Sequence, residues 1–190
     1  FLSEKGINID MTPVKSGERY FYVWSHRKNI GTPLDTGSML MIAEFDPVHP
    51  ERLISEPKCL SRPLYGFENT EHTINNEGPY AFYYNNKIYL AYSGGDARGY
   101  LYAIGMLTAN DGDDLCDLSV WEKAKTPIAS FATIPGEYGP GHNSFFWDRD
   151  QNLWIAYHAV TSFEEKIVSS GMRRVYFEQD KTPRFDVIVE

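Results

Sequence analysis

The feature that most limits how this chain of 190 residues folds is one pattern that occurs three times. Each copy begins with a polar residue, runs through an aromatic and apolar stretch, turns, and ends a second such stretch in Ser or His. The copies span residues 10–25, 77–93 and 142–158, and their first residues lie 67 and 65 positions apart. Repeats of this length built from short strands are typical of propeller blades, because solenoid units usually run about 20 to 50 residues. The pattern predicts an all-β fold of radially repeated blades.

The composition of the chain limits the kinds of partner that it can bind. The formal net charge is −8 and no basic cluster is present, which argues against nucleic-acid binding, since that needs a basic face to neutralise phosphates. No apolar run reaches the roughly 20 residues that span a bilayer, and the first residues do not form a signal peptide. We expect a soluble chain with no nucleic-acid or membrane partner. The compartment, cytoplasmic or secreted, stays open.

A carboxylate stands at the start of the middle copy. Glu77 lies in Asn76-Glu77-Gly78-Pro79, directly before an aromatic and apolar strand. Burial there would favour its protonated form, which is what a general acid requires. An isolated Glu before a strand is more often a solvated loop residue, so the prediction depends on the threefold pattern.

Equivalent positions of successive blades meet at the axis of a propeller. We therefore expect Asp10, Glu77 and His142 to converge, each as the polar start of its copy. Two carboxyls and an imidazole suit glycoside hydrolysis, in which an acid protonates the leaving oxygen while a second carboxylate supports it or activates water.

The motifs of the three copies resemble glycoside hydrolase family 43, in particular its arabinofuranosidase-like and arabinanase-like members. The resemblance covers nearly the whole chain and is carried, in order, by Ile9-Asp10-Met11-Thr12 with Val23-Trp24-Ser25, by Asn76-Glu77-Gly78-Pro79 with Tyr92-Ser93, and by Gly139-Pro140-Gly141-His142-Asn143-Ser144-Phe145 with Tyr157-His158-Ala159. It implies a five-bladed β-propeller. Residues 1–190 would form an incomplete catalytic domain of about three four-stranded blades, with blades starting near 10, 77 and 142 and the N-terminal blade or blades lacking.

The resemblance also implies roles. Glu77 would be the general acid of an inverting glycosidase, and Asp10 the carboxylate that tunes its ionisation and orients it. His142 would be the axial His, next to Ca²⁺ or another ion in the central channel. The family's general base, an Asp, has no counterpart here and would lie upstream, so the isolated chain should be inactive. Its open edges would invite self-association or pairing with the missing N-terminal segment.

The substrate implied is a plant-type oligosaccharide or polysaccharide that carries arabinofuranosyl or xylosyl residues. The candidate substrate-binding residues are Trp24, Phe67, Tyr138, Asn143 and Arg173. Aromatic residues at strand ends more often belong to the core, and Arg173 has an equally good explanation as a surface-strand residue. A non-catalytic carbohydrate-binding or interaction propeller is the alternative function.

Overall fold

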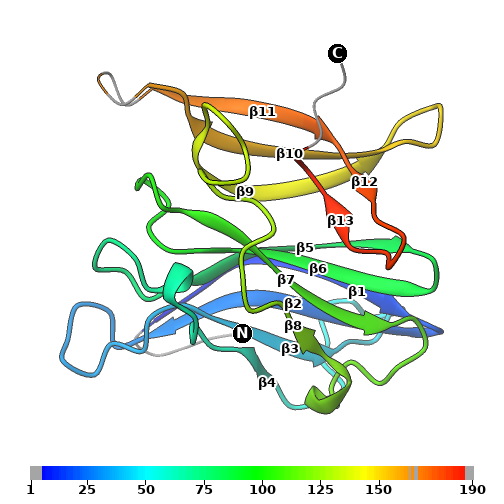
Figure 1. The fold of residues 1–190 in the computed structure, drawn as a ribbon. Helices are drawn as coiled ribbons and strands as arrows, with labels where there is room; N and C mark the ends of the chain where they lie inside the picture. The colour runs from blue at the N-terminus through cyan, green and yellow to red at the C-terminus, as the bar shows by residue number, and fades with distance from the viewer. Residues whose placement is uncertain (1–5, 163, 165–166, 187–190) are drawn as a thin grey trace.

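The computed structural model describes residues 6–162, 164 and 167–186. Three antiparallel sheets, here called blades 1 to 3, lie on one another as layers (Figure 1), and two 3-10 helices of three residues, η1 (Gly66–Glu68) and η2 (Leu118–Val120), complete the described helical structure. The fold is all-β, as predicted, and the three layers are consecutive blades of a partial β-propeller.

The strands follow one another in chain order from the inside of each blade outward. Blade 1 consists of β1 (Gly6–Ser16), β2 (Arg19–Lys28), β3 (Met39–Glu44) and β4 (Lys58–Ser61). Blade 2 consists of β5 (Asn76–Tyr84), β6 (Lys87–Gly94), β7 (Ala103–Asn110) and β8 (Glu122–Lys123). Blade 3 consists of β9 (Tyr138–Trp147), β10 (Leu153–Val160) and β11 (Val168–Arg174), and the ribbon β12 (Tyr176–Phe177) and β13 (Pro183–Arg184) follows it.

Among the described residues, the sheet of blade 3 has three strands, and the segment after β11 forms the separate ribbon β12–β13. The ring of Phe177 in β12 stacks on Tyr84 of blade 2 with 3.7 Å between ring centroids, and it also meets Phe82 and Tyr89. Figure 1 shows this ribbon beside the middle layer. Aromatic rings thus hold the ribbon against blade 2.

Blade 2 lies between the other two and supplies a core to each. Because successive side chains of a strand point to opposite faces, Ile88 and Leu90 of β6 face blade 1 while Tyr89 and Ala91 face blade 3. The first core joins Val14, Phe21, Val23, Leu40 and Ile42 to Ile88, Leu90, Tyr92 and Leu107. The second joins Phe82, Tyr89, Ile104 and Met106 to Phe145, Ile155, Tyr157 and Phe185.

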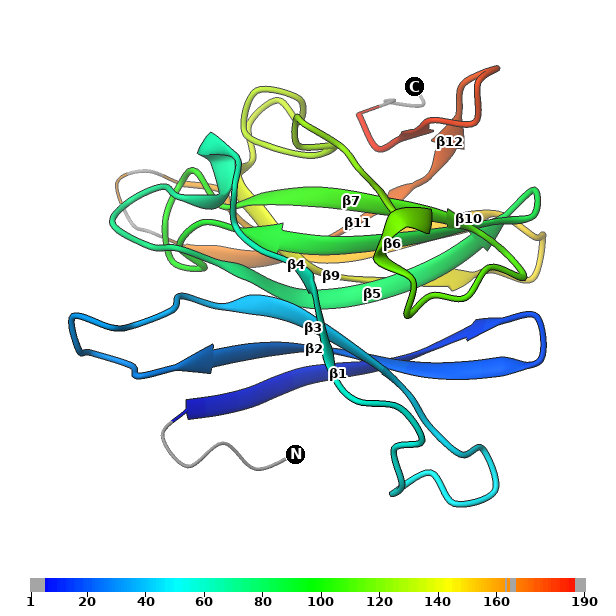
Figure 2. The ribbon, with the colours of Figure 1, turned by 90° about the horizontal axis from the view of Figure 1, so that it is seen from below.

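The loops that join β2 to β3 and β6 to β7 project toward one end of the molecule, at the left of Figure 1, and Figure 2 shows the same layers from below. In the described part of the chain, no helix has the length and apolar character that crossing a membrane requires.

Candidate active site

The first strands of the three blades lie side by side, with β5 packed against both β1 and β9. Each of these strands carries a β-bulge, after Ile9, Glu77 and Gly141, and the first residue of each bulge has positive φ; β9 has a second irregularity, before Gly141. These residues are Asp10 (56°), Gly78 (56°) and His142 (51°). Bulges re-aim side chains and are frequent next to active sites. The three positions are therefore the structural equivalents of the repeat.

This register corrects the predicted equivalence of Asp10, Glu77 and His142. Glu77 still pairs with Ser93 in the regular ladder, and the bulge begins after it, so Gly78 is the counterpart of the other two. A shift of one residue changes the direction of a side chain on a strand. A channel of about 530 Å³ between the first strands is accordingly lined by Asp10, Gly78 and His142 but not by Glu77.

Asp10 is held by groups from two blades. Its Oδ2 accepts hydrogen bonds from the hydroxyl of Ser25 (3.2 Å) and from the backbone N–H of Gly78 (3.1 Å), and its Oδ1 lies 3.8 Å from Nε2 of His142. The carboxylate thus contacts the residue directly after Glu77. Asp10 and His142 converge as predicted, and Asp10 reaches Glu77 through its backbone.

Glu77 meets a tyrosine that lies directly before the third strand of its own blade. The hydroxyl of Tyr102 donates to Oε1 of Glu77 at 2.8 Å, and Tyr102 is fully buried. Ser93, the partner of Glu77 in the hairpin, accepts the backbone N–H of His142 at 2.7 Å. Burial raises the pKa of Tyr102 well above its ordinary value, and the charge of Glu77 raises it further. Tyr102 therefore keeps its proton near neutral pH.

His158 packs on the other side of this group. Its ring stacks on Tyr102 with 5.6 Å between centroids and lies 6.4 Å from the ring of His142. Burial lowers the pKa of His158, and the neighbouring His142 lowers it further, although a bond to the carbonyl of Ala97 acts in the opposite direction. The imidazole is consequently neutral at neutral pH and brings no positive charge to the site.

Comparison with known proteins agrees with this geometry. The sequence profile described as glycosyl hydrolases family 43 matches residues 2–183. The chain belongs to family 43. It is 28% identical over 191 residues to the extracellular exo-α-(1→5)-L-arabinofuranosidase of Streptomyces avermitilis and 35% identical over 144 residues to the enzyme of that name from Streptomyces chartreusis. These alignments cover 96% and 75% of this chain.

The structural comparison leads to the same family. The crystal structure of α-L-arabinofuranosidase from Lactobacillus brevis superimposes with a TM-score of 0.79 at 29% identity, covering 94% of this chain and 55% of that one. The chain spans 38% and 42% of the lengths of the two Streptomyces relatives.

The aromatic residues predicted to bind substrate lie in different settings. Trp24 is only 3% exposed, and its indole N–H donates to Asn8. Phe67 lies in η1, half-buried, with its ring stacked near that of Tyr65. Tyr138 begins β9 and meets Tyr100 edge to face. Their contact with a sugar stays a prediction, and for Trp24 little ring surface is free to make it.

Arg173 is occupied by a network at the blade 2 side of blade 3. Its guanidinium donates to Glu137 at 2.7 Å and to the hydroxyl of Tyr157 at 2.8 Å, and Tyr157 donates to the same carboxylate at 2.6 Å. This fork fixes the loop before β9. A direct bond from Arg173 to a substrate stays a prediction.

Asn143, the fifth predicted substrate-binding residue, lines the channel next to His142 and is 5% exposed. Neither atom of its amide has a hydrogen-bond partner in the described chain. Burial without a partner costs free energy. The amide of Asn143 can therefore accept and donate further hydrogen bonds to a polar group.

An ion next to His142 also stays a prediction. Among residues 6–162, 164 and 167–186, no three His, Cys, Asp or Glu side chains gather closely enough to hold a metal. His142 and Asp10 alone do not fit Ca²⁺, which takes six to eight oxygen ligands.

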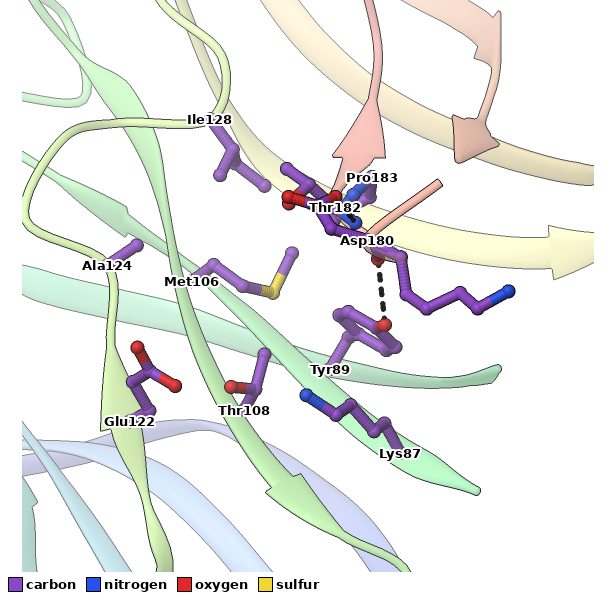
Figure 3. Close-up of a pocket in the computed structure, with 11 residues that line it drawn as sticks. Lys87, Tyr89, Met106, Thr108, Glu122, Ala124, Ile128, Asp180, Thr182 and Pro183 are labelled. Carbon is purple, nitrogen blue, oxygen red and sulfur yellow. Dashed lines mark hydrogen bonds between the residues drawn. The ribbon is translucent and has the colours of Figure 1, made fainter. Parts of the chain in front are cut away.

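A second hollow, of about 270 Å³, lies between blade 2 and the ribbon (Figure 3). The hydroxyl of Tyr89 crosses it to the carbonyl of Lys181 at 2.8 Å, and Met106, Ile128 and Pro183 supply apolar walls. None of the predicted site residues lines it. It belongs to the packing of the ribbon rather than to the axial site.

Sequence reasoning assigned no site role to Tyr102, Ser93 or His158, although Ser93 and His158 end two of the three copies of the pattern. Tyr102 follows a glycine-rich turn and resembles the other tyrosines of the chain. Its bond to Glu77 joins residues 25 positions apart. No local signal could have found it, whereas Ser93 could have been found from its place opposite Glu77 in the hairpin.

Proposed function

We propose that the native protein to which this chain belongs is an inverting glycosidase that releases arabinofuranosyl residues from plant-type oligosaccharides or polysaccharides. Glu77 is the general acid, and Asp10 orients it and tunes its ionisation. The observation that carries this proposal is the coupling of the two carboxyls, because Asp10 accepts the N–H of Gly78 while Tyr102 holds the side chain of Glu77.

In this mechanism Glu77 gives its proton to the glycosidic oxygen while the bond from that oxygen to the anomeric carbon breaks. The electron pair of the bond leaves with the oxygen. A water molecule attacks the opposite face of the sugar, and a base takes its proton. We assign that base to a carboxylate outside residues 1–190, so the isolated chain should not turn over substrate.

The names of the relatives support the choice of sugar. Both Streptomyces proteins are named exo-α-(1→5)-L-arabinofuranosidases, and the Lactobacillus brevis protein is an α-L-arabinofuranosidase. Arabinofuranosyl is therefore placed before xylosyl. We assign the aromatic residues Phe67 and Tyr138 to contacts with the sugar.

The test is Glu77→Gln in the full-length native protein. Hydrolysis of arabino-oligosaccharides should fall about 10²- to 10⁴-fold, the usual contribution of a general acid, while circular dichroism stays unchanged. Proton NMR of the first-formed sugar should show the inverted anomer. Unchanged turnover would exclude Glu77 as the acid, and sugar binding without any hydrolysis by the native protein would favour a non-catalytic propeller.

The outer faces of the first and last blades carry exposed apolar side chains. Ile7, Ile9 and Met11 of β1 are 39% to 52% exposed, and Val168 and Met172 of β11 are 58% and 65% exposed. We assign these faces to contact with further sheet structure of the native protein, because an exposed patch of apolar side chains marks an interaction surface. Light scattering of residues 1–190 tests this: self-association should appear in the isolated chain and be absent from the native protein.

A further inference from the structure

The two oxygens of the Glu77 carboxyl have different surroundings. Oε1 accepts the hydroxyl of Tyr102 at 2.8 Å, whereas Oε2 has no hydrogen bond to a described residue. A neutral carboxyl carries its proton on one oxygen only, and an oxygen that already accepts a short hydrogen bond is the poorer place for it. The surroundings therefore distinguish the two oxygens before any substrate arrives.

We propose that Tyr102 is a positioning residue for the acid, holding Oε1 of Glu77 so that the transferable proton is carried on Oε2. This inference rests on the proposed function, since it assigns the geometry of the same acid. Tyr102 contacts neither the reacting bond nor the sugar and acts through Glu77.

Tyr102 is fixed in place by its packing. Its ring is fully buried and stacks on His158 at an interplanar angle of 13°. It also fills the space beside Gly141, where an added Cβ would lie 2.1 Å from the ring. The ring cannot move aside without disturbing blade 3, so its hydroxyl stays directed at Glu77.

The acceptor fixes the direction of that hydroxyl. Among the described residues, the hydroxyl of Tyr102 donates its hydrogen to Oε1 of Glu77 at 2.8 Å. Tyr102 is fully buried, and a hydrogen bond in such surroundings is electrostatically stronger than in water.

The same bond favours proton transfer itself. When the proton passes from Oε2 to the glycosidic oxygen, the carbon–oxygen bond breaks with its electron pair going to that oxygen, and Glu77 becomes a carboxylate. The bond from Tyr102 then ends on a charged acceptor and becomes stronger. An interaction that strengthens along the reaction lowers the barrier. Tyr102 does not give up its own proton.

The experiment compares leaving groups in the full-length native protein. Phenyl α-L-arabinofuranoside needs protonation of its leaving oxygen, whereas the 2,4-dinitrophenyl glycoside leaves as a stable anion without it. Tyr102→Phe should lower kcat/KM for the phenyl substrate by about 10- to 100-fold, the loss expected for one hydrogen bond to a charged group. For the dinitrophenyl substrate it should stay within about threefold.

Tyr92→Phe is the matched control, because Tyr92 is also fully buried and also donates to a carboxylate, Oε1 of Glu68, at 2.7 Å. It should lower stability without changing the ratio of the two substrates. Should Tyr102→Phe fail to fold, 3-fluorotyrosine at position 102 replaces it, since it keeps the ring and its hydroxyl and changes the strength of the bond that the hydroxyl donates to Glu77. An equal loss on both substrates in either variant would overturn the inference.

Glu77→Gln separates this inference from the proposed function. If Glu77→Gln itself shows no preference between the leaving groups, the acid has been assigned wrongly. If Glu77→Gln shows it and Tyr102→Phe does not, only the role of Tyr102 fails. In the double variant, Tyr102→Phe should add little to Glu77→Gln, because residues that act through one another are not additive.

Discussion

The backbone N–H of Gly78 donates a 3.1 Å hydrogen bond to Oδ2 of Asp10, across the boundary between the first two blades. Gly78 follows Glu77, so the position of the proposed acid depends on a carboxylate 68 residues before Gly78. The hydroxyl of Ser25 joins the same two groups, because it donates to Oδ2 of Asp10 and accepts from the N–H of Gly78, each at 3.2 Å. Two blades thus have to be assembled before the site exists.

Replacing Asp10 by Asn should separate its charge from its structural role. The amide oxygen of Asn can still accept the N–H of Gly78, so thermal unfolding should change little. The lost charge should lower kcat/KM of the native protein roughly 10²-fold. Asp46→Asn is the control, because Asp46 also accepts backbone N–H groups, from Val48 and His49, and lies in a loop outside the axial site. Full activity in Asp10→Asn would contradict the assignment.

Gly78→Ala should lower both stability and activity. Gly78 has a φ of 56°, which costs other residues about 1 to 2 kcal/mol, and its added Cβ would meet the ring of His142 at 3.4 Å. Gly31→Ala is the matched control, since Gly31 also has a positive φ, of 74°, and an added Cβ there meets nothing within 4 Å. Chemical denaturation should give similar losses for both variants. Only Gly78→Ala should reduce kcat/KM, and equal activity in the two would argue against the axial site.

Lys123→Met should destabilise the fold by about 3 to 5 kcal/mol, because it leaves the fully buried carboxylate of Glu68 without its cation. Glu68 also accepts the backbone N–H groups of Leu64 and Tyr65, each at 2.7 Å, so it anchors the loop before β5. Urea denaturation measures the change, and the exposed Lys125→Met should alter stability by less than about 0.5 kcal/mol. A similar small change for Lys123→Met would show that the pair contributes little.

The stability of the protein at acid pH should depend on the carboxylate of Asp148, in the turn between β9 and β10. The indole N–H of Trp154 and the N–H groups of Asn152 lower the pKa of Asp148 from 3.8 to about 2. A depressed pKa means that the stabilisation is complete above pH 3.8 and is lost as the pH falls toward 2. Melting temperatures of the wild type and Asp148→Asn should therefore differ at pH 6 and converge near pH 2. Asp150→Asn, whose side chain accepts none of these bonds, should show no such convergence, and a constant difference for Asp148→Asn would contradict the prediction.

The blades could be predicted because their signals are local. The hairpin of blade 2, for instance, has aromatic and apolar residues on both sides of the Asn85-Asn86 turn, and both of these residues adopt positive φ. The register at the axis could not be predicted. Sequence spacing set Glu77 level with Asp10 and His142, whereas a bulge of the backbone gives that place to Gly78. The contact of Phe177 with Tyr84 could not be predicted for a related reason, because it joins the ribbon after β11 to another blade.

The sequence by itself determined that this chain forms repeated β-hairpins and that a polar residue begins each one. Its motifs were also enough to indicate family 43. Periodic burial and turn chemistry act over a few residues, so they can be read from the chain. Only the tertiary structure decided which oxygen of Glu77 meets Tyr102, how Gly78 reaches Asp10, and that Arg173 is bound to Glu137. These contacts join residues 25 to 68 positions apart, and their geometry depends on how whole sheets pack.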